Sequence, residues 1–165
     1  CQATTTLFVV SALSLVQVGG SVLIDNCDRN GFGLQFDGLQ KVFGSLTVTN
    51  TAAMNEVRLP LMTSVGGQFR IQGNVGQTLL NAPVLCGIGG DLFVGGAALS
   101  ERNTRLADVQ MCSAGMTVGG SVVVGNRSTD LLCSELTEFC RSTADLTIQA
   151  EGTGTAGADI PCVCQ

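Results

Sequence analysis

An internal repeat of 23–24 residues limits the possible folds of this 165-residue chain more than any other feature of its sequence. In each copy one small residue precedes a short β-rich run, and these residues are Gly20, Gly44, Gly67, Gly90, Gly120 and Ala144. They are spaced by 24, 23, 23, 30 and 24 residues, so one copy carries an insertion of about seven residues near 95–109. A repeat this short cannot bury an apolar side alone, and its copies must stack. The chain is therefore predicted to form a solenoid of about six coils.

The apolar residues of each copy alternate with polar ones. The second and fourth residues after the glycine are apolar in every copy: Val22, Leu46, Phe69, Leu92, Val122 and Leu146, then Ile24, Val48, Ile71, Val94, Val124 and Ile148. The residue directly after the glycine is polar, as at Ser21 and Asp91. This period of two is typical of a strand with one buried face. When the copies are aligned, a further pair of positions upstream of the glycine forms two columns, which start at Val10 and Ala12. The second column places Cys112 in the fifth copy, and the pair predicts a second strand. Each copy thus predicts about two strands and a corner.

Glycine and asparagine are expected to shape the turns between strands. Glycine suits a position that needs either a positive φ or close packing against a neighbouring coil. Asparagines occupy one turn column at Asn26, Asn50 and Asn126, with Asn74 one residue later. Stacked asparagine side chains can bridge neighbouring backbones, so this column is expected to link adjacent coils.

These patterns predict an all-β fold, a right-handed parallel β-helix (β-solenoid) over residues 1–148, with a disulfide-rich cap or tail over residues 149–165. The alternative is a leucine-rich repeat, whose period also includes 23–24 residues. That repeat spaces its apolar residues as L-x-x-L-x-L, whereas Val65, Phe69 and Ile71 are four and then two residues apart. It also carries a helical segment in each copy, which the linkers rich in Gly, Thr and Pro disfavour.

Eight cysteines and no histidine predict four disulfides and an extracellular setting. The cysteines are Cys1, Cys27, Cys86, Cys112, Cys133, Cys140, Cys162 and Cys164. The repeat register places Cys1 over Cys27, lets Cys86 pair with Cys112, and leaves the last four to tie the tail to the last coil. The alternative is a four-cysteine zinc site, but no cysteine pair has the C-x-x-C spacing that such sites favour. The sequon at Asn126 is a predicted glycosylation site, and the apolar run 7–16 is too short to span a bilayer.

One stretch of the repeat resembles a known family. Residues 56–74, Glu-Val-Arg-Leu-Pro-Leu-Met-Thr-Ser-Val-Gly-Gly-Gln-Phe-Arg-Ile-Gln-Gly-Asn, closely resemble the repeat of receptor L domains. The nearest version is that of GPI-anchored fungal cell-wall proteins, and residues 80–94 repeat the pattern. The resemblance covers residues 7–148 and implies a right-handed β-helix at the cell surface. Its motif is structural and implies no catalytic residue.

Composition argues against catalysis and against nucleic-acid binding. The absence of histidine removes histidine-based triads, histidine metal sites and the commonest general base. A net charge of −5, without Tyr or Trp to stack on bases, makes nucleic acid a poor partner. Parallel β-helices also host carbohydrate-active enzymes that use clustered carboxylates, but the outward Asp91 and Asp145 lie two coils apart. Solvated surface charge is the better interpretation of these two aspartates.

Two other groups of residues are candidate sites. Asn26, Asp28, Asn30 and Asp37 echo a calcium-binding loop, although Asn stands first and Asp replaces the usual Glu. A tight turn between coils needs the same residue types, and this is the favoured interpretation. On the outward strand face, Phe93 and Val123 are expected to lie side by side, with Leu23 further along, as a small contact patch.

The sequence therefore predicts a non-catalytic structural or recognition module, extracellular or at the cell surface, without a cofactor. Its expected partner is a protein or a cell-wall glycan, and no membrane span is expected. The first alternative is a self-assembling subunit of an extracellular filament, because low charge and open solenoid ends permit stacking. The second alternative is a carbohydrate-active β-helix enzyme.

Overall fold

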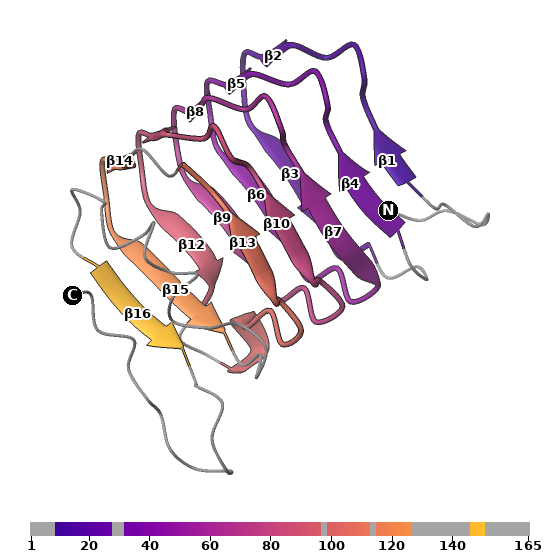
Figure 1. The fold of residues 1–165 in the computed structure, drawn as a ribbon, viewed down its shortest axis with the longest axis vertical. Helices are drawn as coiled ribbons and strands as arrows, with labels where there is room; N and C mark the ends of the chain where they lie inside the picture. Colours follow the sequence, from indigo (N-terminus) through magenta and orange to yellow (C-terminus); the bar gives the residue numbers. More distant parts are fainter. Residues whose placement is uncertain (1–8, 28–31, 97–98, 113–114, 127–145, 151–165) are drawn as a thin grey trace.

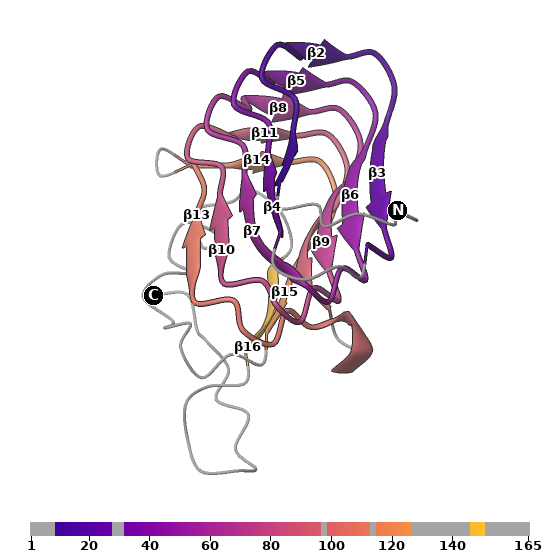
Figure 2. The same cartoon turned by 90° about the vertical axis from the view of Figure 1, so that its right-hand side faces the viewer.

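The computed structural model describes residues 9–27, 32–96, 99–112, 115–126 and 146–150. Within these ranges the chain is an all-β solenoid made of three parallel sheets (Figure 1). The chain runs through sheets A, B and C in turn, so that strands three apart in the sequence become neighbours in space. Figure 2 shows the short strands of sheet B crossing one side of the solenoid while sheets A and C form its two flanks.

Sheet A contains β1 (Val9–Ser11), β4 (Phe32–Gln35), β7 (Met54–Arg58), β10 (Leu79–Asn81) and β13 (Asp108–Gln110). Sheet B contains β2 (Gln17–Val18), β5 (Lys41–Val42), β8 (Ser64–Val65), β11 (Gly87–Ile88) and β14 (Thr117–Val118). Sheet C contains β3 (Val22–Asp25), β6 (Leu46–Thr49), β9 (Phe69–Gln72), β12 (Leu92–Gly95), β15 (Val122–Asn126) and β16 (Leu146–Ala150).

The β-solenoid prediction is confirmed, but two of its details change. The described ranges hold five coils with a strand in every sheet, and β16 adds one further strand to sheet C, so the count differs from the predicted six. Each coil contributes three strands rather than two. The apolar residue two positions before the repeat glycine, such as Val42 or Val65, ends a two-residue strand at the expected corner.

The predicted inward columns form the core. Leu46, Phe69, Leu92 and Val122 pair in register across sheet C, and each is completely buried. In sheet A the register shows one error of the sequence alignment. Val109 pairs with Leu80 and so belongs to the strand rather than to the insertion. The pairing of Asn81 with Gln110 then places Met111, not Cys112, at the next inward position of the fifth coil.

Close packing, not backbone conformation, explains the repeat glycine. The positive-φ glycines of the described ranges are Gly73, Gly95 and Gly115, and none of them is a repeat glycine. A Cβ added to Gly90 would lie 3.0 Å from the carbonyl carbon of Gly67, closer than real Cβ atoms normally approach backbone. The coils therefore touch through their backbones at this column, and a side chain has no room there.

Asparagine does bridge the coils: in the predicted column Asn50 Nδ2 donates to Asp25 Oδ1 of the preceding coil at 3.0 Å, and a buried ladder lies one residue later, where the sequence has Asn74. Asn26 and Asn50 lie at the ends of strands with φ values of 53° and 54°, which is a left-handed turn conformation that asparagine tolerates. The buried ladder lies at Thr51, Asn74 and Asn103. Asn74 Oδ1 accepts from Thr51 N at 3.0 Å, and Asn103 Oδ1 accepts from Asn74 N at 3.0 Å. The Asn126 side chain is outside the described part.

The insertion forms the 3₁₀ turn η1 (Leu99–Glu101), which is held beside sheet C because Gly73 N donates to Glu101 O at 2.9 Å. Cys86 and Cys112 form a disulfide with a Cα–Cα distance of 5.0 Å, as the sequence allowed, and it closes the loop that contains this insertion.

Cys27 is also disulfide-bonded. Its predicted partner Cys1 lies outside the described residues. So do the other tail cysteines, Cys133, Cys140, Cys162 and Cys164, and all of the predicted cap except 149–150. No helix in the described ranges is long and apolar enough to cross a membrane.

Candidate functional site: two outward sheet faces

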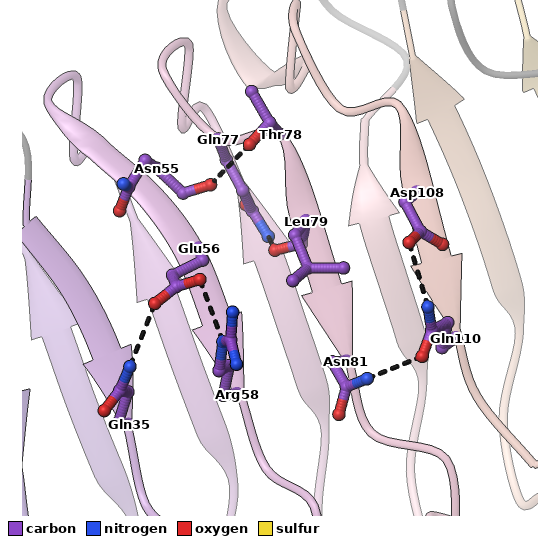
Figure 3. Close-up of polar contacts among 10 residues, drawn as sticks. All are labelled: Gln35, Asn55, Glu56, Arg58, Gln77, Thr78, Leu79, Asn81, Asp108 and Gln110. Carbon is purple, nitrogen blue, oxygen red and sulfur yellow. Dashed lines mark hydrogen bonds and ion pairs between the residues drawn. The ribbon is translucent and has the colours of Figure 1, made fainter.

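The outward face of sheet A carries a row of polar side chains that bind one another (Figure 3). Gln35 Nε2 donates to Glu56 Oε1 at 3.0 Å, and Arg58 Nε donates to Glu56 Oε2 at 2.8 Å. The two oxygens of one carboxylate therefore connect β4 with β7 and also hold Arg58 along its own strand. Because Arg58 is about half exposed, this ion pair contributes little to stability.

A second set of contacts continues this face across β10 and β13. Asn81 Nδ2 donates to Gln110 Oε1 at 2.6 Å, and Gln110 Nε2 donates to Asp108 Oδ2 at 2.9 Å. The half-buried Leu79 lies between the two sets (Figure 3). The amide and carboxylate groups of this face are thus largely paired with each other, which leaves a flat polar surface.

The outward face of sheet C begins with a polar row at the residue after each repeat glycine. Ser45 Oγ accepts from Gln68 N at 3.0 Å, and Ser21 Oγ accepts from Ser45 N at 3.0 Å. Asp91, an aspartate considered for catalysis, accepts from Gln68 Nε2 at 2.9 Å and from Ser121 N at 2.9 Å. The Asp91 carboxylate therefore joins neighbouring coils. Asp145, its suggested partner, lies outside the described part of the chain.

The next outward row of sheet C contains the predicted contact patch. Phe93 and Val123 are paired in register, so the expected neighbours do lie side by side. Both are half-buried, and the Arg70 guanidinium lies 4.3 Å from the centroid of the Phe93 ring. This cation–π contact covers part of the aromatic face. Leu23, in the same row on the first described coil, is 70% exposed.

The last outward row of sheet C holds a carboxylate with an altered pKa. Asp25 Oδ1 accepts from Thr49 Oγ1 at 2.8 Å and from Asn50 Nδ2 at 3.0 Å. These bonds, the Thr49 one first, hold the pKa of Asp25 below its usual value because they favour the charged form. Asp25 is therefore ionised at neutral pH and faces solvent.

A hollow of about 380 Å³ opens on this part of sheet C. It is lined by Leu23, Asp25, Thr47, Thr49, Asn50, Arg70, Gln72, Gly73 and Glu101. Its lining residues come from three neighbouring strands, β3, β6 and β9, from the turns after β6 and β9, and from η1. Figure 2 shows these three strands side by side. Glu101 comes close to Gln72, because a Cβ added to Gly96 would contact the Glu101 carboxylate and lie 2.8 Å from Gln72 Nε2. The insertion thus turns the edge of a flat sheet into a recess.

Hydrogen-bonding groups of both kinds line this hollow. The Thr47 hydroxyl makes no hydrogen bond within the described residues. Gln72 is 6% exposed; its Nε2 donates to Gly95 O at 2.8 Å, and its Oε1 accepts nothing from the described part of the chain. Arg70 donates to Gln68 Oε1 at 3.4 Å, which engages one of its five N–H groups. Donors and acceptors therefore remain available to a ligand.

The predicted calcium ligands are only partly described. Asn26 follows β3 in sheet C, whereas Asp37 follows β4 in sheet A. These two residues therefore follow strands of different sheets, and their joint binding of a calcium ion stays a prediction. Asp28 and Asn30 lie outside the described residues. Among the residues that are described, no three His, Cys, Asp or Glu side chains gather in a group that could hold a metal.

Sequence reasoning missed the hollow. Most of its residues stand in the outward columns of three successive copies, Asn50 and Gly73 stand in the turns that follow these strands, and Glu101 stands in the insertion. The insertion was itself the available signal, since insertions in repeat proteins fall as loops on one face, often the binding face. The predicted glycosylation residue Asn126 ends β15, and the other two residues of its sequon lie outside the described part.

No protein-family model matches the chain, and no curated protein or solved structure matches it either. Function must therefore be inferred from the residues and geometry of the molecule itself.

Proposed function

We propose that this chain is a non-catalytic structural or recognition module, extracellular or at the cell surface, with the right-handed β-helix of the receptor L-domain type. The likeness of residues 56–74 to the repeat of cell-wall proteins supports the family. The disulfides at Cys27 and Cys86–Cys112 support an oxidising compartment. The partner would be a glycan or protein of the cell surface or wall.

The outward faces of the solenoid carry this proposal. Sheets A and C present broad strand faces on a scaffold whose coils are joined by backbone ladders and buried side chains. Asp91, the described member of the aspartate pair considered for catalysis, is engaged in holding coils together. A rigid scaffold with a recess beside its one insertion is suited to binding.

The proposal is tested with the purified, disulfide-intact protein. We expect it to adhere to intact cells or to insoluble wall material, to show no free thiol under native conditions, and to leave wall polysaccharides intact. Free, reactive thiols in the native protein would contradict the extracellular assignment. Polysaccharide cleavage that is lost in Asp91→Asn would contradict the non-catalytic assignment.

Self-assembly into a filament is a second candidate, favoured by the first described coil. Leu13, Leu15 and Val16 are 66%, 37% and 46% exposed there, beside β1, β2 and β3, which are the edge strands of the three sheets among the described residues. A second copy of this chain that covers this edge would extend the sheets and bury these side chains. Light scattering over a concentration series tests the candidate: it predicts growth in mass that Leu13→Glu reduces. A constant monomer mass at the highest concentration excludes it.

A further inference from the structure

We propose that the hollow on sheet C binds one or two units of an uncharged glycan, with Asp25, Thr47, Arg70 and Gln72 as the main contacts to sugar hydroxyls. The inference rests on the proposed recognition function and names the ligand class and the site. At the hollow a flat solenoid face acquires a wall, which is supplied by the insertion. Its volume of about 380 Å³ falls within the range of small-ligand sites.

The charges in the hollow favour a neutral ligand. The Asp25 carboxylate and the Arg70 guanidinium, two charges of opposite sign, both line the hollow. A phosphate or other anion would meet the ionised Asp25 carboxylate beside a single guanidinium, whereas sites for such anions gather several Arg, Lys or backbone N–H groups. A metal ion would meet the Arg70 charge and too few carboxylates, since calcium takes six to eight oxygen ligands. A polyol carries no charge, so neither the carboxylate nor the guanidinium of the hollow repels it.

The hydrogen-bonding groups match a ligand whose hydroxyls donate and accept. The Asp25 carboxylate has about four acceptor positions, and the bonds from Thr49 and Asn50 occupy two of them. Gln72 Oε1 is a further acceptor, held in place because Gln72 Nε2 is bound to Gly95 O. The Thr47 hydroxyl and the remaining Arg70 N–H groups supply donors. Sugar hydroxyls pair with both kinds of group, so no polar group of the hollow need be buried without a partner.

Apolar surface adjoins these polar groups. Leu23 lines the hollow and is 70% exposed, and the Phe93 ring lies under the Arg70 guanidinium. Sugar rings present C–H faces beside their hydroxyls, and burying those faces on Leu23 adds a favourable apolar contact. The contacts of Asp25 and Gln72 exist without a ligand, so binding requires little ordering of these side chains.

The experiment measures binding of neutral oligosaccharides of glucose, mannose and N-acetylglucosamine by saturation-transfer NMR and calorimetry. Asp25→Asn and Thr47→Val change the hollow while nearly keeping side-chain shape. Their matched controls are Asp37→Asn, in the turn after β4, and Thr117→Val on sheet B, neither of which lines the hollow. Thermal unfolding and a far-UV spectrum of each variant show that its fold is kept. We expect at least one sugar to bind, with about a tenfold or greater loss in Asp25→Asn, a severalfold loss in Thr47→Val and no loss in the controls.

Several results would overturn the inference while the proposed function survives. One is adhesion to cells or wall material that the two hollow variants leave unchanged, because another face then makes the contact. Another is a hollow that binds calcium or inorganic phosphate alone, seen by calorimetry, and no neutral sugar. The proposed function itself fails separately, if the unaltered protein adheres to no cell or wall material.

Discussion

Leu15 in the first described coil is 37% exposed, whereas Leu39, at the same place in the second coil, is completely buried. The same contrast holds one column further on, where Val18 is half-buried and Val42 is 1% exposed. The two coils share one sequence pattern, but only the second has a described coil on each side. The difference shows that the core belongs to the interfaces between coils rather than to any single coil. The position of a residue in the stack, and not its type alone, should therefore set the cost of replacing it.

Truncation of the buried Leu39 should have the largest effect on the free energy of unfolding. Leu39→Ala is expected to lower the free energy of unfolding by about 2–5 kcal/mol, because it leaves a cavity between coils. Leu15→Ala should cost less than about 1 kcal/mol, because much of that side chain already meets water. Urea denaturation followed by circular dichroism measures both. Equal losses in the two variants would show that the first coil is as well covered as the second.

Removal of the central asparagine of the buried ladder should come next. Asn74 Oδ1 accepts from Thr51 N and Thr51 Oγ1, and its Nδ2 donates to Val48 O at 3.1 Å. Asn74→Ala leaves these buried groups without partners and should cost about 2–3 kcal/mol. The control is Asn55→Ala, since the Asn55 residue is exposed. Chemical denaturation of both variants checks the difference, and a small loss for Asn74→Ala would mean that water replaces the ladder.

The repeat glycine offers a matched pair at one column. A Cβ on Gly90 would lie 3.0–3.1 Å from three backbone atoms of the preceding coil, whereas a Cβ on Gly20 would meet nothing within 4 Å. Gly90→Ala should cost about 1–2 kcal/mol through this overpacking. Gly20→Ala should be neutral or stabilising by about 0.5 kcal/mol, because alanine restricts the unfolded chain. Melting temperatures report both, and a neutral Gly90→Ala would show that the coils can separate at this corner.

The smallest effect concerns the polar link between the first two coils. Asp25 on β3 accepts from Thr49 on β6, and this bond lowers the Asp25 pKa. A lowered pKa in the folded state gives stability that is present above the unfolded value near 3.8 and is lost as the pH falls through the folded value. Thr49→Val should raise the Asp25 pKa toward that value, which an NMR titration of the carboxyl carbon measures. An unchanged pKa would show that the remaining groups, the Asn50 side chain and the Asn26 backbone first among them, hold the carboxylate.

The strand pattern was largely predictable because it depends on which side of a strand faces the core. The inward columns at Leu46, Phe69 and Leu92 follow from alternation along the sequence, and their register in sheet C is confirmed. The two-residue strands of sheet B were not predicted, since two residues are too few to show a period. The misplacement of Cys112 has a similar cause, because an insertion hides the residue at which the register resumes.

The hollow could not be predicted from periodicity. Its residues, such as Asp25, Thr47 and Arg70, occupy outward positions that carry no common residue type along the column. Whether these side chains can bind a ligand depends on which of them already bind each other. The same amide and carboxylate groups are paired with one another on sheet A, at Glu56 and Gln110, yet remain partly available in the hollow.

The sequence by itself determined the β-solenoid, its period, its inward columns, the position of its insertion and the possible pairing of Cys86 with Cys112. These depend on the spacing of apolar residues and on the need of each copy for a neighbour, and both can be read along the chain. Only the tertiary structure decided why the repeat residue is glycine, which asparagine is buried, and where a recess opens. These depend on distances between atoms of different coils, such as those around Gly90 and Asn74, and no local pattern specifies them.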